Sequence, residues 1–302
     1  MTSTSPDVTF DYRSDDGNSI VVYRWNTNER PRAAMQLTHG MGEHGLRYGE
    51  FARALNTKGI VVYAQDQRGH GATAKATHNF GSLGHNGWQM LINDIHLLVK
   101  HIRTEHSNTP LILLGHSMGS FAVQQYLIDH SNDIDATILT GTVALDLIAP
   151  AFNLDQPFDL SSLNTPFQPS RTDFDWLSRD ETIVDAYVKD PLCGFGLDTE
   201  SVKGMISGGQ RMVDTQLLQQ IRHDLPIYIS VGESDPIHQQ LAGVKILVDR
   251  FQTAGLTDIT LKTYPHARHE VLNETNRNEI VNDILNWIDN KVLTLQVTSK
   301  KS

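Results

Sequence analysis

The stretch Leu111-Ile-Leu-Leu-Gly-His-Ser117-Met-Gly-Ser-Phe-Ala-Val-Gln-Gln-Tyr126 decides the fold. Four apolar residues, typical of a buried strand, run directly into a Gly-x-Ser-x-Gly pattern, and a helical pattern follows at once. Ser117 is therefore predicted to lie on a sharp turn between a strand and a helix. Side chains at Gly115 and Gly119 would collide with the neighbouring strand and helix in so tight a bend, so both positions need glycine.

This turn has a chemical consequence for Ser117. It exposes the hydroxyl and places the next backbone N–H, that of Met118, at a helix N-terminus, where developing negative charge is favourable. A serine hydroxyl is a poor nucleophile near neutral pH, and it needs a base whose tautomer is fixed by a third group. In proteins with this turn, an acid follows the serine along the chain and the histidine comes last.

Outward from the turn, short apolar segments alternate with amphipathic helical patterns such as residues 88–102 and 280–288. This alternation predicts an α/β fold with a mostly parallel sheet and helices on both faces. Two β-rich runs near the N-terminus, separated by residues 14–18, predict an antiparallel hairpin. The predicted strands are residues 8–12, 20–25, 34–38, 60–64, 111–114, 136–140, 227–231 and 259–264.

The regular alternation stops between residues 144 and 215, where prolines separate short helical pieces such as 181–188. This segment lies between two predicted strands, and α/β sheets bind ligands at the carboxyl ends of their strands. We therefore interpret residues 144–215 as a cap subdomain over the active site, inserted into a single domain of residues 1–302. The alternative is a side lobe that does not touch the substrate.

The acid and the base are expected in the loops after the last two predicted strands. Strand 227–231 leads into a loop that contains Asp235, the expected acid, and Glu233, the alternative. Strand 259–264 is followed by two histidines, His266 and His269. Spacing alone does not choose between these histidines.

A second donor for an oxyanion is expected in the loop after strand 34–38. There the glycines around Met41 allow its backbone N–H to turn inward. His39 and His116 flank this loop and the nucleophile instead of following the acid. Structural hydrogen bonding is therefore expected for both histidines.

Two further features are expected to have structural roles. Asp66 and Arg68 lie in the turn after strand 60–64, where they are predicted to hold neighbouring loops. Cys193 is the only cysteine, so it forms no internal disulfide. Nothing nearby in the sequence would lower its pKa, and a packing role is expected.

The composition restricts the partners of the chain. Its 35 acidic and 25 basic residues give a formal net charge of -10, which repels nucleic acid and gives no charge-based attraction to an anionic membrane. This negative net charge is more compatible with uncharged substrates. The N-terminal residues lack the basic and apolar segments of a secretion signal, so a cytoplasmic location is expected. No stretch approaches the roughly 18 uninterrupted apolar residues of a transmembrane helix.

Several motifs together resemble those of the monoacylglycerol lipase and lysophospholipase family of α/β-hydrolases, which is also grouped with serine aminopeptidase-like hydrolases. The resemblance covers most of the chain and includes cap segments 174–180 and 187–192. It implies the α/β-hydrolase fold. The matching motifs are His39-Gly-Met-Gly-Glu-His44 with Arg47-Tyr48, Asp66-Gln-Arg-Gly-His-Gly71, Gly115-His-Ser-Met-Gly119 and Arg268-His-Glu-Val-Leu-Asn-Glu274.

The resemblance also implies the site residues. Ser117 is the expected nucleophile, His269 the base and Asp235 the acid, with the amides of Met41 and Met118 as oxyanion donors. The implied substrate is a lipid-like monoester, such as a monoacylglycerol or a lysophospholipid, whose acyl chain lies under the cap. No metal or organic cofactor is needed for this reaction.

The cap is expected to provide the apolar part of the site. Because of the implied substrate, it is also a candidate for transient contact with a membrane surface. We expect several of its apolar residues to line an acyl tunnel. These residues are Leu145, Leu147, Ile148, Phe152, Leu154, Phe158 and Leu163.

Two other functions are considered from the sequence. A prolyl-type aminopeptidase would need acidic cap residues to hold the substrate amine, and Asp173, Asp175, Asp180 and Glu181 are available for this role. A receptor that keeps the fold without turnover commonly lacks a catalytic residue. Here serine, acid and base all occur in the required order, which favours an enzyme.

Overall fold

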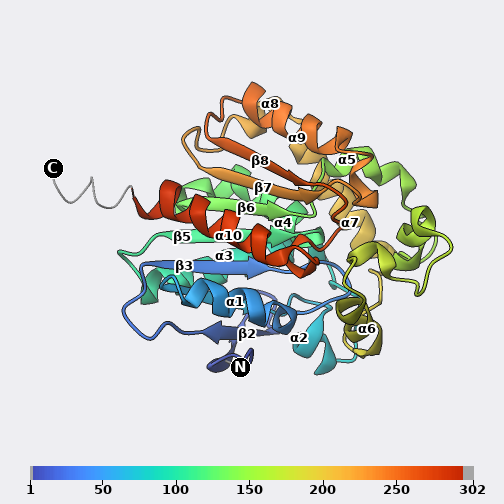
Figure 1. Ribbon diagram of the computed structural model, residues 1–302, viewed down its shortest axis with the longest axis horizontal. Helices are drawn as coiled ribbons and strands as arrows, with labels where there is room; N and C mark the ends of the chain where they lie inside the picture. Colours follow the sequence, from blue (N-terminus) through green and yellow to red (C-terminus); the bar gives the residue numbers. More distant parts are fainter. Residues whose placement is uncertain (1–2, 295–302) are drawn as a thin grey trace.

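The described part of the chain, residues 3–294, forms one eight-stranded sheet in the computed structural model (Figure 1). The strand order is β1-β2-β4-β3-β5-β6-β7-β8. The β1–β2 and β2–β4 pairs are antiparallel, and the other pairs are parallel. The strands are β1 (Val8–Arg13), β2 (Ser19–Trp25), β3 (Ala33–Thr38), β4 (Ile60–Gln65), β5 (Leu111–His116), β6 (Ala136–Thr140), β7 (Ile227–Gly232) and β8 (Ile259–Tyr264).

The strands differ in how their residues are buried. Strands β3 to β7 are buried along their whole length, as expected for parallel strands covered on both faces. The edge strand β1 instead alternates half-buried and exposed residues. Its connection to β2 is a tight turn in which Gly17 has a φ of 87° and donates to Ser14 O at 2.9 Å. The predicted hairpin, parallel sheet and strands are confirmed.

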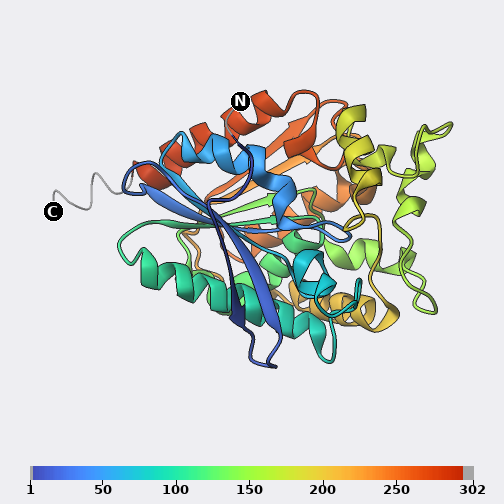
Figure 2. The same cartoon turned by 90° about the horizontal axis from the view of Figure 1, so that it is seen from below.

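Helices cover both faces of the sheet, as Figure 2 shows. Helices α1 and α10 pack on one face through residues such as Leu55 and Ile284. Helices α3, α4 and α9 belong to a second apolar cluster on the other face. The helices are α1 (Gly49–Asn56), α2 (Gly71–Lys75), α3 (Gly87–Glu105), α4 (Met118–His130), α5 (Leu145–Ile148), α6 (Glu181–Lys189), α7 (Thr199–Gly209), α8 (Thr215–Leu218), α9 (Ala242–Thr253) and α10 (Arg277–Ile288).

The segment between β6 and β7 carries α5 to α8 and several short 3-10 turns. Its middle part lies beyond the carboxyl ends of the parallel strands (Figures 1 and 2). A small apolar cluster of Leu160, Trp176, Leu177 and Tyr187 forms its centre. Helix α7 instead joins the cluster around α3 and α4. The interpretation of residues 144–215 as a functional cap stays a prediction at this point.

The ends of the predicted single domain, residues 1–2 and 295–302, lie outside the described residues. Within residues 3–294, no helix has both the length and the apolar character needed to cross a membrane.

Candidate active site

Ser117 lies between the end of β5 and the start of α4, on the sharp turn predicted from the sequence. Its backbone has a φ of 51° and a ψ of -123°, a conformation that a residue with a side chain rarely adopts. A Cβ added at Gly115 would lie only 2.6 Å from Gly119 O, and one added at Gly119 would collide with the carbonyl oxygens of β3 and the following loop. The predicted requirement for both glycines is confirmed.

His269 and Asp235 form a buried pair next to this turn. His269 Nδ1 lies 2.8 Å from Asp235 Oδ2, and the side chains are 2% and 0% exposed. The other carboxylate oxygen accepts from the backbone N–H of Ile237 at 3.0 Å, which fixes the acid. The structure therefore brings together the two residues that the resemblance singled out.

The electrostatics of this pair favour an ionised acid. Burial by itself would raise the pKa of Asp235, but the charge of His269 and its hydrogen bond keep that pKa below its usual value. Burial would likewise lower the pKa of His269. The charge of Asp235, its hydrogen bond and the charges of Glu270 and Glu43 together outweigh burial, so the pKa of His269 lies above its usual value. Each group thus favours the charged form of the other.

The alternative acid and base lie elsewhere. Glu233 is exposed and accepts a hydrogen bond from Thr263 Oγ1 at 2.8 Å. His266 is also exposed, in a turn where its φ is 61°. Neither residue lines the cavity that contains Ser117. Geometry therefore separates the two histidines that spacing left equivalent.

The loop after β3 runs against the nucleophile turn. A Cβ added at Gly40 would lie 3.1 Å from Ser117 Cβ. Met41 and Met118 both line the cavity, and neither backbone N–H donates to another residue of the described chain. Both amides are thus available to a substrate oxygen next to Ser117.

A cavity of about 280 Å³ contains Ser117 and His269 and is otherwise mainly apolar. Of the residues expected to line an acyl tunnel, Ile148, Phe152, Phe158 and Leu163 contribute to its wall. The other three do not. They are Leu145, which is buried in the main core, Leu147, which packs against that core, and Leu154, which is exposed.

Comparisons with known proteins agree with this geometry. Residues 29–276 match the family model described as serine aminopeptidase, S33. The chain belongs to the S33 family. A monoacylglycerol lipase of Mycolicibacterium smegmatis is 30% identical over 275 residues, which cover 90% of this chain and 93% of that protein.

Solved structures give the same fold for this S33 family member. A thermostable carboxyl esterase of Bacillus coagulans aligns with a TM-score of 0.84 and 27% identity, over 94% of this chain and 98% of that one. A monoglyceride lipase of Saccharomyces cerevisiae aligns with a TM-score of 0.77 and 22% identity, over 96% of each chain. The predicted resemblance and the α/β-hydrolase fold are confirmed, and the chain is an enzyme of the serine hydrolase class.

The two histidines beside Ser117 in this S33 family member, His39 and His116, both form hydrogen bonds within the protein. His39 Nε2 accepts from the backbone N–H of Gln67 at 3.0 Å, and His116 Nδ1 lies 3.0 Å from Thr140 Oγ1. Burial lowers the pKa of His39 well below its usual value and that of His116 to about 3. Both rings are therefore neutral near pH 7, and their predicted structural role is confirmed.

Asp66 and Arg68 hold loops together, as predicted. Asp66 accepts hydrogen bonds from Tyr23 Oη, the Gly45 N–H and the Ala72 N–H at 2.7 to 2.8 Å. Arg68 pairs with Asp94 and Asp16, each at 2.8 Å. These contacts connect β2, the β1–β2 turn, the 3-10 turn before α1, the start of α2 and the middle of α3.

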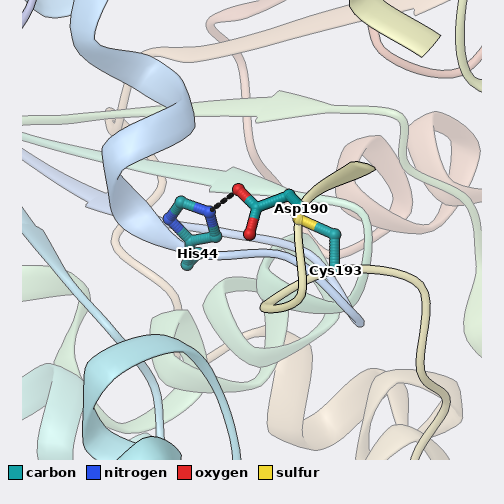
Figure 3. A group of neighbouring side chains, drawn as sticks. All are labelled: His44, Asp190 and Cys193. Carbon is teal, nitrogen blue, oxygen red and sulfur yellow. Dashed lines mark hydrogen bonds and ion pairs between the residues drawn. The ribbon is translucent and has the colours of Figure 1, made fainter. Parts of the chain in front are cut away.

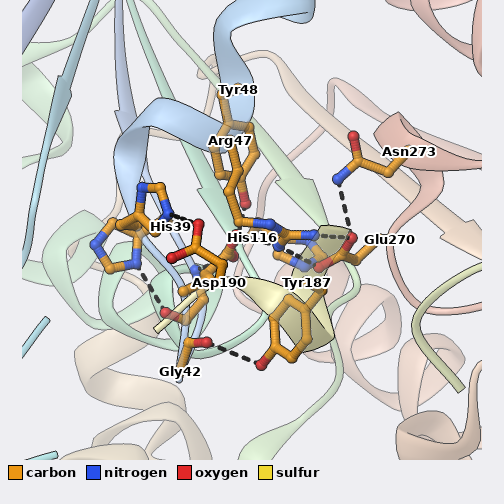
Figure 4. A network of polar contacts seen from close by, with 12 residues as sticks. His39, Gly42, Arg47, Tyr48, His116, Tyr187, Asp190, Glu270 and Asn273 are labelled. Atoms are coloured by element: carbon orange, nitrogen blue, oxygen red, sulfur yellow. Dashed lines mark hydrogen bonds and ion pairs between the residues drawn. The ribbon is translucent and has the colours of Figure 1, made fainter. Parts of the chain in front are cut away.

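A buried ionic network lies beside the cavity and was not predicted. Arg47 bonds Glu43 at 2.7 Å. It also bonds both carboxylate oxygens of Glu270, at 2.5 and 2.7 Å (Figure 4). Glu43 also accepts from the Gly40 N–H at 2.6 Å and Tyr48 Oη at 2.8 Å. Burial would raise the pKa of Glu270, but the charge and hydrogen bonds of Arg47, together with smaller contributions that include the Asn273 hydrogen bond, lower it to about 2. The network thus ties the loop after β3 to the residue after His269. We call this loop, residues 39–44, the oxyanion loop because it contains the predicted oxyanion donor Met41.

The inserted segment contacts the same two loops. Tyr187 of α6 donates from Oη to Gly42 O at 2.8 Å, and its ring lies 4.8 Å from Arg47 Cζ (Figure 4). The Trp176 ring packs 4.8 Å from the His269 ring. Leu177 O accepts from the Glu270 N–H at 2.8 Å. Residues far apart in sequence therefore contact both the predicted base, His269, and the loop after β3.

Figure 3 shows a second contact of the insertion with the oxyanion loop. His44 Nε2 lies 2.9 Å from Asp190 Oδ2, and Cys193 lies beside this pair. Cys193 packs against the apolar cluster of the insertion, and burial raises the pKa of its thiol. The predicted packing role of Cys193 is confirmed.

Proposed function

We propose that the chain is a serine carboxylic-ester hydrolase that acts on lipid-like monoesters, such as a monoacylglycerol or a lysophospholipid. The observation that carries this proposal is the buried Asp235–His269 pair at 2.8 Å, beside a mainly apolar cavity into which a strained turn presents Ser117. The Mycolicibacterium smegmatis relative, named a monoacylglycerol lipase, supports the choice of substrate class.

In the proposed reaction, Ser117 Oγ attacks the carbonyl carbon of the ester while His269 Nε2 takes the hydroxyl proton. Asp235 keeps the proton on His269 Nδ1 and stabilises the imidazolium that forms. The Met41 and Met118 amides donate to the oxyanion of the tetrahedral intermediate. His269 then gives its proton to the leaving alcohol, and an acyl-enzyme on Ser117 remains.

Water completes the cycle by the same chemistry. His269 takes a proton from water as its oxygen attacks the acyl-enzyme carbon, and the same two amides hold the second oxyanion. Collapse of this intermediate releases the carboxylic acid, and the proton returns from His269 to Ser117. No step calls for a metal or an organic cofactor.

We propose that residues 144–215 act as the cap of this site. Ile148, Phe152, Phe158 and Leu163 would contact the acyl chain, because they line the cavity on the side of the insertion. The proposed substrate is a lipid, so we also propose that the cap makes transient contact with a membrane surface. Leu154 is 37% exposed on the insertion and is a candidate for that contact.

An aminopeptidase activity is less well supported. A substrate amine would need a carboxylate with free acceptor positions, and the two glutamates that line the cavity already bind protein donors. Glu270 uses both oxygens for Arg47, and Glu43 receives Arg47, Tyr48 and the Gly40 N–H. The four acidic residues considered for this role, Asp173, Asp175, Asp180 and Glu181, do not line the cavity.

One panel of substrates separates these activities. A monoacylglycerol, a lysophosphatidylcholine and a prolyl arylamide would be assayed with the same preparation, and the Ser117→Ala variant would measure any contaminating enzyme. We expect the highest kcat/KM for one of the two lipid esters. A higher kcat/KM for the arylamide would contradict the proposal.

A further inference from the structure

Two histidines and an aspartate meet at the end of α4 that is remote from Ser117. His96 comes from α3, His130 is the last residue of α4, and Asp133 ends the following 3-10 turn, Ser131–Asp133. His96 Nδ1 and His130 Nδ1 lie 3.6 and 3.5 Å from the same atom, Asp133 Oδ2. All three donor atoms lie within 4.8 Å of one another.

These distances do not describe ordinary hydrogen bonds. An N–H···O bond has a donor–acceptor distance of about 2.7–3.2 Å, which is shorter than both values. Two ligands of one tetrahedral zinc ion, each about 2.0–2.2 Å from the metal, lie about 3.3–3.6 Å apart. The His96 and His130 rings are stacked at 4.0 Å with an interplanar angle of 21°, and His96 Nδ1 also lies 3.5 Å from Tyr126 Oη. An imidazole nitrogen binds a metal in the plane of its ring, so a shared ion requires one of these partly exposed rings to rotate out of the stack.

We propose that His96, His130 and Asp133 bind a divalent transition metal ion of the zinc class, which fastens α3 to the C-terminal end of α4. Two imidazoles and a carboxylate are a ligand set that suits zinc, and copper and nickel also accept it. Water completes the coordination, because the three side chains are only partly buried and the site opens to solvent.

The charges around the site are compatible with a cation. Arg103 does not occupy the Asp133 carboxylate, because its Nε donates to Asp133 O and its Nη2 pairs with Asp135. Lys100 is the other cation that acts on His96, and Asp15 opposes it. Asp129 lies near His130 and adds a further negative charge, although it is paired with Arg211.

The protonation state of His96 is compatible with a metal ligand. Burial lowers the pKa of His96 below its usual value, and the neighbouring His130 lowers it further. The neutral ring is the form that coordinates a metal, so His96 needs to release no proton near pH 7.

The site is separate from the proposed ester hydrolysis, which uses no metal. Its structural consequence concerns α4, whose first residue is Met118 and whose last is His130. A bound ion would hold the far end of this helix against α3. Because it binds the folded chain only, it should raise the melting temperature as its concentration increases. The turnover of the ester should not change.

The test is a titration of the full chain, produced without a histidine tag, with Zn²⁺ and separately with Co²⁺. Calorimetry measures affinity and stoichiometry for Zn²⁺, and the visible absorption of Co²⁺ reports the coordination geometry. The variants are His96→Ala/His130→Ala and the gentler Asp133→Asn. The controls are His101→Ala, which removes another histidine of α3, and Cys193→Ala, which disrupts the group in Figure 3.

We expect one Zn²⁺ per chain, at least tenfold weaker binding in both site variants, and unchanged binding in both controls. Equal affinity in the original chain and Asp133→Asn would overturn the proposal even where the double variant does not fold. Loss of binding in Cys193→Ala would place the ion beside His44 instead and would also overturn it. So would the absence of saturable binding to the original chain.

Discussion

Two parts of the insertion are attached to the molecule in different ways. Residues 174–194, the inner part, make polar contacts with the loops that contain the predicted oxyanion donor and the predicted base. Tyr187 contacts Gly42 and Arg179 contacts Glu274, each at 2.8 Å. Residues 149–170, the outer part, make mainly local hydrogen bonds, such as that from the Ser161 N–H to Asp159. Their wall of the cavity is apolar, with the Phe152 and Phe158 rings 4.5 Å apart.

Because of this difference, we expect the two parts of the insertion to have different functions. Hydrogen bonds are directional, so the inner part can fix the orientation of the oxyanion loop and the base. Apolar contacts depend on area and shape, so the outer part can select the length of an acyl chain. Substitutions in the inner part should therefore change kcat, and those in the outer part should change the preference among esters. The following predictions test that distinction.

The largest effect is expected for Ser117, the proposed nucleophile. The loss of kcat in its variant sets the scale against which substitutions in both parts of the insertion are compared. Ser117→Ala should lower kcat on an aryl ester by roughly 10³ or more, because the attacking oxygen is lost while the fold is kept. Steady-state kinetics and circular dichroism measure the two properties. Near-native kcat in a preparation free of other esterases would refute the assignment of Ser117.

An effect of similar size is expected for one of the two histidines of the base loop. His269→Ala should lower kcat by roughly the same factor as Ser117→Ala, because members of a triad act as a unit. The matched control His266→Ala should stay within roughly tenfold of the original enzyme, since that side chain is exposed outside the cavity. The reverse pattern of activities would exchange their roles.

A smaller effect is expected where the inner part holds the oxyanion loop. Tyr187→Phe removes the hydroxyl that donates to Gly42 O and keeps the ring over Arg47. We expect kcat to fall by roughly tenfold, which corresponds to about 1.4 kcal/mol of transition-state stabilisation, with little change in KM. The loss should be the same for short and long esters. A change confined to long esters would remove the proposed distinction between the two parts.

The outer part should show the opposite pattern. Leu163→Trp enlarges a side chain of the cavity wall, so it should reduce kcat/KM for long-chain esters by roughly tenfold and for acetate esters by no more than about twofold. A panel of aryl esters of increasing chain length measures this. Equal losses for all chain lengths, in this and other enlarged wall residues, would favour a side lobe over a substrate-binding cap.

The smallest effect concerns the pH profile. His269 must be neutral to accept the proton of Ser117, and its pKa lies above the usual value of about 6.5 because of Asp235. Thus kcat/KM should fall as the pH falls through this raised pKa. The midpoint of this decrease, on the acidic limb of the pH profile, should lie above about pH 6.5. Leu163→Trp should leave that limb in place, because it does not touch His269. A limb well below this value would contradict the pairing with Asp235.

Much of the fold could be predicted because its signals are local. Alternating apolar segments and helical spacing predicted the strands, and the glycines around Ser117 predicted the turn on steric grounds. The choice of His269 over His266 could not be made this way. Both histidines follow the same strand, and only their packing distinguishes a buried ring beside Asp235 from an exposed one.

The ionic network around Arg47 was not predicted, for a related reason. Arg47 and Glu270 are 223 positions apart, so no local pattern connects them, although both lie in motifs that the resemblance had singled out. The apolar residues of the insertion posed another difficulty, because short helices and 3-10 turns give little periodicity. The sequence did not show that Leu145 faces the core while Ile148 faces the cavity.

Because of the backbone conformation of Ser117, the residue that the proposed reaction needs is not the one that gives the most stable fold. A non-glycine residue held at a φ of 51° carries strain of about 1–3 kcal/mol, whereas glycine reaches the same conformation freely and loses about 0.5–1 kcal/mol through its greater chain entropy. A chain with glycine at this position would thus be the more stable one, and under the proposed mechanism it would be inactive. Under that mechanism, mutations that increase stability would remove the nucleophile, so only continued selection for turnover would keep the serine in place.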